Sequence, residues 1–145
     1  MRQLYLYYAE ALNESGADYT QVLPWIDKVR ARSGVPDVAT SWDKYSYTPG
    51  CYKEKVGLRS IIHREEMIEM MFEHQMAWDV RRWKEAMTTF NRTITGWNYT
   101  EVADDKYYQE QVHYQQGFET KGYFWPIKNS ELYSNNHLIK NPGWK

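Results

Sequence analysis

Glu110 and His113 have the Glu-x-x-His spacing with which di-iron carboxylate proteins bind metal. Such a centre needs two of these motifs on facing helices and two further glutamates. This sequence has one motif, and it lies in a stretch whose aromatic and β-branched residues are typical of a strand. We therefore interpret Glu110 and His113 as surface polar residues, and we expect neither a metal site nor a cofactor.

Three glutamates follow one another at steps of four residues, which places them on one face of a helix. Carboxylates in this arrangement can bind a metal or act as an acid–base pair. They can also be neutralised by arginine or lysine, and an unpaired buried charge is very costly. We interpret this row, together with the Asp-Val-Arg-Arg group that follows it, as structural ion pairs. The candidates are Glu65, Glu69, Glu73, Asp79, Arg81 and Arg82.

Arg30, Arg32 and Arg82 are the candidate partners for the three glutamates. If the partner of Glu69 is left buried, the substitution Glu69→Ala is expected to lower the free energy of unfolding by about 3 kcal/mol or more.

The other reactive side chains do not form a recognisable catalytic set. No Ser or Cys stands in a nucleophile–His–acid pattern with any of the four histidines, and no glycine-rich phosphate loop is present. Cys51 is the single cysteine, which excludes a disulfide framework and a cysteine-based zinc site. Nothing in these residues therefore argues for catalysis, and we predict no catalytic residues.

Aromatic residues make up 17% of the chain, with seven Trp and thirteen Tyr, so some of these rings are expected on a surface. Residues 37–56 and 91–106, both predicted as loops, carry Trp and Tyr among Asp, Asn, Ser and Thr. Aromatic faces beside hydrogen-bonding side chains suit the apolar faces and hydroxyl rims of sugars. The alternative is that the rings pack down and anchor long loops onto helices. The glycan-contact candidates are Trp42, Tyr45, Tyr47, Trp97 and Tyr99.

Composition limits the classes of protein that remain. The 145 residues are enough for one domain with a hydrophobic core. The net charge of −1 comes from 18 basic and 19 acidic residues without a long basic block, which argues against nucleic-acid binding. No signal peptide and no transmembrane run occurs in these residues.

The pattern of apolar residues predicts a mainly α fold. Apolar residues recur at steps of three or four from Leu58 to Trp83, which predicts a long central helix. Residues 1–34 predict an antiparallel helix pair of tetratricopeptide-like length, and because one such repeat does not bury its faces alone, we expect further helices before Met1. The predicted order is a helix pair over 1–34, an ordered loop over 37–56, the central helix over 58–87, a small β-hairpin over 107–127 near the C-terminus and a wrapping tail over 128–145.

Three stretches, in order, resemble one family. Residues 5–36 contain YLYYAEALNESG and WIDKVRARSGVPDV, residues 62–83 read IHREEMIEMMFEHQMAWDVRRW, and the tail contains YFWPIKNSELYSNNHLIKNPGW. Together they closely resemble the C-terminal part of the SusD/RagB family of outer-membrane nutrient-binding lipoproteins. The chain departs from the family pattern at Glu66, His74 and Met76, where the family commonly has Arg, Gly and Arg, so its ion pairs are expected to differ in detail.

The resemblance implies a tetratricopeptide-like helical scaffold whose loops bind oligosaccharide or another nutrient, and a binding protein that is not an enzyme. It also implies a surface-exposed position at the outer membrane, held by a lipid anchor that these residues do not contain. The partner that it implies is a TonB-dependent outer-membrane transporter, to which the glycan is delivered.

Two functions of different class follow from these observations. The first is the glycan-binding component of a surface nutrient-uptake system, of which this chain is a C-terminal fragment. The alternative is a helical protein–protein interaction module with no sugar site in these residues. Burial of all five candidate rings would exclude the sugar surface and favour the alternative.

Overall fold

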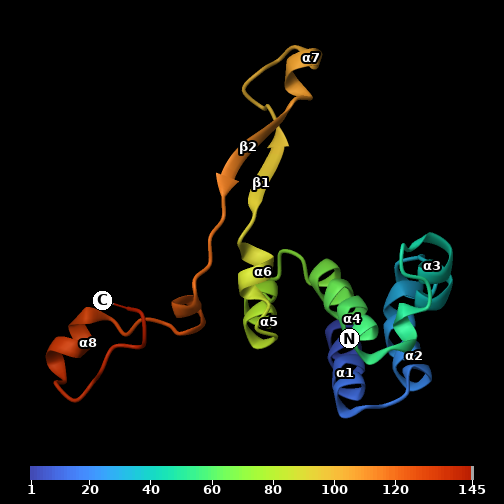
Figure 1. The fold of residues 1–145 in the computed structure, drawn as a ribbon, viewed down its shortest axis with the longest axis horizontal. Coiled ribbons are helices and arrows are strands. Elements are labelled where there is room, and N and C mark those ends of the chain that lie inside the picture. Colours follow the sequence, from blue (N-terminus) through green and yellow to red (C-terminus); the bar gives the residue numbers. More distant parts are fainter. Residues whose placement is uncertain (145) are drawn as a thin grey trace. The chain divides into compact units, whose positions relative to one another are not determined.

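The fold is mainly helical with one small antiparallel sheet, as the sequence predicts. The computed structural model describes residues 1–144 and divides into two compact units, residues 1–76 and 77–145 (Figure 1). The first unit holds α1 (Arg2–Ser15), α2 (Tyr19–Arg32), α3 (Val38–Tyr45), the 3-10 helix η1 (Cys51–Lys53) and α4 (Lys55–Glu69). The second follows with α5 (Met76–Arg82), α6 (Ala86–Phe90), β1 (Thr93–Trp97), α7 (Asp104–Tyr107), β2 (Glu110–Gln115), η2 (Thr120–Tyr123) and α8 (Asn129–Ser134).

Helices α1 and α2 correspond to the helix pair predicted over residues 1–34. Gly16 ends α1 in the left-handed conformation, with φ +87°. Asp18 begins α2, and its carboxylate accepts a hydrogen bond from the Thr20 N–H at 3.0 Å. Helix α4 packs with this pair around the hydrophobic core of the first unit. The side chains with no or almost no exposed surface there include Leu6, Ala9, Val22, Ile26, Val38, Leu58, Ile61 and Ile62.

The long central helix predicted over residues 58–87 is wrong, because the structure has α4, α5 and α6 in its place. Between α4 and α5, Phe72 and His74 take positive φ angles of 67° and 60°, which no α-helix contains. Phe72 is exposed and Ile68 is half exposed, so these two members of the apolar pattern lie outside a core, whereas Val80 of α5 is buried. Because packing supplies most of the stability of a helix in a protein, the pattern alone does not extend α4.

The hairpin predicted over residues 107–127 is also corrected. Strand β2 lies in this range, but it pairs with β1, which falls in the predicted loop 91–106. The register joins Thr93 to Gln115 and Trp97 to Glu110. The expected second strand is instead the 3-10 helix η2 and extended chain. Its backbone groups bond elsewhere: the Phe118 N–H donates to Asn91 Oδ1 at 2.6 Å.

The segment 37–56, predicted as an ordered loop, contains α3 and η1. Asp37 begins α3, and its carboxylate accepts from the Thr40 N–H at 2.8 Å. The Thr40 hydroxyl also donates to this carboxylate at 2.8 Å, and the two bonds lower the pKa of Asp37. Asp27 on α2 accepts the Val38 N–H at 2.9 Å, and burial raises the pKa of this carboxyl. Two aspartates therefore fix the first turn of a helix that the apolar pattern does not reveal.

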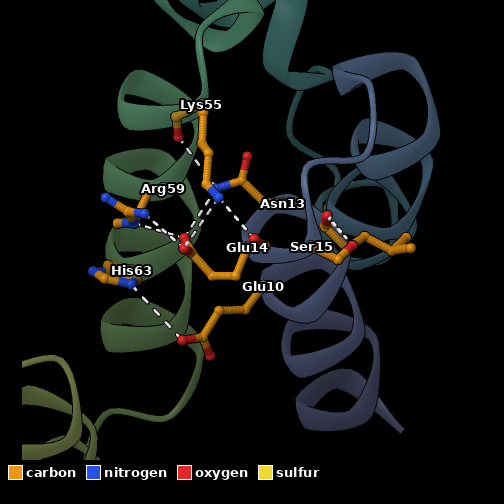
Figure 2. A network of polar contacts seen from close by, with 8 residues as sticks. Glu10, Asn13, Glu14, Ser15, Lys55, Arg59 and His63 are labelled. Carbon is orange, nitrogen blue, oxygen red and sulfur yellow. Dashed lines mark hydrogen bonds and ion pairs between the residues drawn. The ribbon is translucent and has the colours of Figure 1, made fainter.

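A polar network joins α1 to α4 (Figure 2). Glu14 accepts two hydrogen bonds from Arg59, both at 2.6 Å, and these bonds lower the pKa of Glu14. Lys55 Nζ donates to the Glu14 carbonyl at 2.7 Å, while Asn13 donates to the Lys55 carbonyl at 3.2 Å. One turn deeper, His63 Nε2 lies 4.0 Å from Glu10 Oε1, and both side chains are buried. The network fixes the register of α4 against α1.

Gly57 lies where the backbone of α4 passes close to Cys51 of η1. A Cβ atom there would lie 2.1 Å from the Cys51 carbonyl oxygen. Gly57→Ala is therefore expected to lower the free energy of unfolding by about 2 kcal/mol, because backbone must move, even though Ala is the better helix former. Urea unfolding measures this. The control is Gly117→Ala, where the nearest atom would be 4.0 Å away, and an equal loss at both positions would contradict the steric explanation.

Candidate functional site

Trp42, Tyr45 and Tyr47 lie on α3 and the turn after it, but they differ in exposure. Trp42 packs against the core of the first unit, and the Arg30 guanidinium lies 5.6 Å from its ring centre. Tyr45 and Tyr47 are exposed, and the Lys44 ammonium lies 5.1 Å from the Tyr45 ring. Trp42 therefore packs down and anchors its segment onto the helices, which is the alternative to sugar contact. The other two rings are accessible to a ligand.

Trp97 and Tyr99 lie at the end of β1 in the second unit, and both rings are exposed. Tyr99 stacks on His113 of β2 with ring centres 5.0 Å apart and an angle of 27° between the planes. The rings of Trp97 and Tyr108 make an edge-to-face contact, with their centres 5.7 Å apart. Tyr107 in turn contacts Tyr108 at 5.1 Å. We call Trp97, Tyr99, Tyr107, Tyr108 and His113 the hairpin aromatic group.

Backbone pairing positions the hairpin aromatic group. The N–H of buried Asn98 donates to the carbonyls of Tyr107 and Gln109, at 3.0 and 3.1 Å. This closes the loop between the strands, so that Tyr99 and Tyr107 lie near the same end of the hairpin. Gly96 leaves room for the neighbouring ring, since a Cβ atom there would lie 3.0 Å from His113 Cδ2. The imidazole Nε2 is 3.0 Å from the Trp97 carbonyl oxygen, which holds the ring in place.

His113 thus covers one face of the Tyr99 ring, while Tyr99 as a whole residue is 72% exposed. A ring held from one side presents a flat apolar surface on the other, and its hydroxyl group stays available for hydrogen bonds. Polar side chains lie close by, because the Thr100 hydroxyl donates to Asn98 Oδ1 at 2.6 Å. This is the arrangement that stacking on a sugar ring requires. Contact with a glycan stays a prediction.

Sequence reasoning missed Tyr107, Tyr108 and His113 as neighbours of Trp97 and Tyr99. It paired β2 with the following segment, which placed β2 and the ring-bearing loop in different parts of the fold. The signal for a strand was present in TITGW, where the β-branched residues Ile94 and Thr95 lie beside small and aromatic residues.

A second feature without a sequence signal is a hollow of about 720 Å³ in the second unit. It lies between the end of α5, the segment 117–126 and the end of the described chain. Aromatic rings, two cationic side chains and the carboxylate of Glu119 line it. The main lining residues are Arg81, Phe118, Lys121, Phe124, Trp125 and Trp144.

Each of the three glutamates of the predicted row forms an ion pair, and the three pairs differ in how far they are buried. Glu65 pairs with Arg30, and the two side chains keep only 9% and 11% of their surface. Burial raises the pKa of Glu65, and Arg30 lowers it only in part. Glu69 lies 2.8 Å from Arg32, whose side chain is 55% exposed. Glu73 pairs with Arg2, which also approaches Glu69 at 3.9 Å. The row therefore ties α4 and the residues after it to α1 and α2.

In the Asp-Val-Arg-Arg group, unlike the row of glutamates, not every charged side chain forms an ion pair. Buried Asp79 pairs with Arg82 at 3.2 Å. Arg81 does not join an ion pair with any carboxylate among the described residues. It donates instead to the carbonyls of Ala77 and Gly122, at 2.5 and 3.3 Å. The prediction of an ion pair at Arg81 is therefore corrected to bonds with main-chain oxygens.

Within residues 1–144 no group of three or more His, Cys, Asp or Glu is placed to hold a metal ion. Glu110 and His113 are both exposed on β2. The helices of the described residues include none that is long and apolar enough to cross a membrane.

Comparison with known proteins agrees with this architecture. The model of the SusD family matches residues 3–144. A crystal structure of a SusD-like protein from Bacteroides fragilis is similar to this structure, with a TM-score of 0.79 and 26% sequence identity. The similarity covers 99% of this chain and 25% of the other, so the chain spans about a quarter of the length of that relative. A search of curated proteins gave no match.

Proposed function

The chain belongs to the SusD family, and from this premise we propose that it is part of a glycan-binding protein in a surface nutrient-uptake system. The protein would hold oligosaccharides without changing them and deliver them to a TonB-dependent outer-membrane transporter. Family membership supports binding in place of catalysis, and a lipid-anchored position on the outer membrane. Co-purification of this protein and the transporter from outer membranes tests the delivery step.

The exposed aromatic rings are the observation that carries the proposal. Four of the five candidate rings are exposed, in two separate places on the chain. Tyr99 is the best platform, because His113 fixes one face of its ring and leaves the other to a ligand. We assign to Tyr99 stacking on a sugar ring, and to Trp97 and Tyr108 contacts beside it. Tyr45 and Tyr47 form a second candidate surface in the first unit.

Removal of the Tyr99 ring provides the test. Single-site affinity for a neutral oligosaccharide is expected near millimolar, about −4 kcal/mol. Tyr99→Ala should weaken it about fivefold, because a ring contact contributes on the order of 1 kcal/mol. Titration by NMR against a panel of neutral oligosaccharides measures the change.

Tyr133→Ala is the matched control, since Tyr133 is also an exposed tyrosine of the second unit, on α8 and away from the hairpin. This variant should bind like the parent. Equal weakening by both substitutions would remove Tyr99 from the site. Absence of binding to every glycan in the panel would reject the proposal and favour the protein–protein interaction module.

A further inference from the structure

The hollow in the second unit is a built site and not a gap between loose loops. The Trp144 indole N–H donates to the Phe124 carbonyl at 2.8 Å, with the Lys121 carbonyl at 3.2 Å. The Asn141 amide donates to the Trp125 carbonyl at 2.5 Å. These bonds tie the end of the chain to the segment that contains η2. Gly143 permits the approach, because a Cβ atom there would lie 2.7 Å from Lys121 Cβ.

Hydrogen bonds also hold the opposite wall of the hollow in place. Asn91 and Phe118 exchange two hydrogen bonds, one from the Asn91 amide at 3.0 Å and one to its oxygen at 2.6 Å. Arg81 links α5 to η2 through the Gly122 carbonyl. Its guanidinium lies 5.3 Å from the Phe118 ring centre and 5.8 Å from that of Trp125. Side chains that are already fixed lose little entropy when a ligand binds.

The hollow carries positive charge among its rings. Arg81 is half-buried, and no carboxylate of the described residues forms an ion pair with it. Two of its five N–H groups donate to the carbonyls given above, and the others remain for a ligand. Lys121 lies over the Trp144 ring at 5.6 Å and pairs with Glu119 at 2.8 Å. Glu119 also lines the hollow, so its two cations and one carboxylate leave a net charge of +1. The Glu119 side chain is largely exposed, so water screens much of its pair with Lys121.

Rings and cations together define the ligand class. We propose that the hollow binds a uronic acid residue of an acidic oligosaccharide, with its carboxylate against Arg81 and Lys121. Trp125 and Trp144 would contact the apolar face of the sugar ring. A volume of about 720 Å³ lies within the usual range for small-molecule sites. This inference rests on the proposed function and adds to it the acidic substrate class and a second site.

Comparison of a charged with a neutral ligand is the first test. The whole chain is titrated with trigalacturonate and with the neutral galactotriose, by calorimetry and by tryptophan fluorescence. Trigalacturonate is expected to bind about tenfold more tightly, because charge-assisted hydrogen bonds are about twice as strong as neutral ones. The preference should shrink at 1 M salt, where the Debye length falls to about 3 Å. Equal affinity for the two ligands would overturn the inference.

Substitutions locate the binding. Arg81→Gln and Lys121→Gln should each reduce the affinity for trigalacturonate at least threefold and leave the affinity for galactotriose unchanged. The control is Lys128→Gln, an exposed lysine that does not line the hollow. Circular dichroism verifies folding, and Arg81→Lys replaces Arg81→Gln if the latter unfolds. Trp125→Ala should also weaken uronate binding, since the Trp125 ring is exposed to the hollow.

Failure of this inference is distinguishable from failure of the proposed function. Neutral glycans that bind through Tyr99, without any preference for trigalacturonate, would overturn the acidic site alone. Unchanged uronate binding in the Arg81, Lys121 and Trp125 variants would do the same. Absence of binding to every glycan, neutral or acidic, would overturn both.

Discussion

Ile62→Ala is expected to lower the free energy of unfolding by about 3 kcal/mol. Ile62 lies on α4 with no exposed surface, in the core that α4 forms with α1 and α2. Removing its outer carbons takes away buried apolar surface and leaves a cavity that the three packed helices fill only in part. Urea denaturation followed by circular dichroism measures the change.

Ile68→Ala, on the same helix, is the matched control. Ile68 belongs to the same apolar pattern in the sequence, but it is 51% exposed. We expect its substitution to cost less than about 1 kcal/mol, because a surface substitution leaves no cavity and Ala is the better helix former. If the two variants were equally unstable, the core would extend over Ile68, contrary to the structure.

This pair of isoleucines also shows how far apolar periodicity predicts a fold. The pattern places Leu58, Ile61 and Ile62 correctly in the core. It continues to Ile68 and Phe72, which are 51% and 91% exposed, and α4 ends between them at Glu69. Periodicity reports which residues share a helix face. It does not report whether another element covers that face.

The helix pair was predictable because its signals are local. Gly16 takes the left-handed conformation that ends α1, and Ser33-Gly34 follows α2. The partner of β2 was not predictable in this way, because pairing with β1 depends on how 12 residues between the strands close through Asn98. The residue types of the candidate site were therefore visible in the sequence, but their neighbours were not. The hollow has no local pattern, because its walls come from four separate parts of the chain: Arg81, Asn91, the segment 117–126 and Trp144.

Burial of Glu65 gives the row of carboxylates an expected pH dependence. The folded pKa of Glu65 is raised above its ordinary value, mainly by burial. The folded state therefore keeps the Glu65 carboxyl protonated at pH values where the unfolded state has lost that proton. This contribution to stability is complete below the unfolded pKa and is lost as the pH rises through the folded pKa. Substitution of Glu65 by Ala should remove that slope from the stability profile.

Glu65→Ala is expected to lower the free energy of unfolding by about 3 kcal/mol at neutral pH. It leaves the buried guanidinium of Arg30 without its carboxylate, although Arg30 keeps hydrogen bonds to the Pro36 carbonyl at 2.7 Å and to the Ser41 hydroxyl at 2.8 Å. Urea unfolding at pH 7 measures the loss. A loss below about 1 kcal/mol would mean that these two bonds and water compensate the charge.

Glu69→Ala, one turn along the same helix, is the control, and its expected effect changes once the partner is known. The loss of about 3 kcal/mol assumed a buried partner. Arg32 is 55% exposed and returns to water, so we now expect about 1 kcal/mol or less. Because both carboxylates are paired with arginines of α2 and tie helices together, neither variant should alter glycan affinity per folded molecule. A folded Glu65 variant that had lost binding would place this row in the site, contrary to the structural role that its arginine partners indicate.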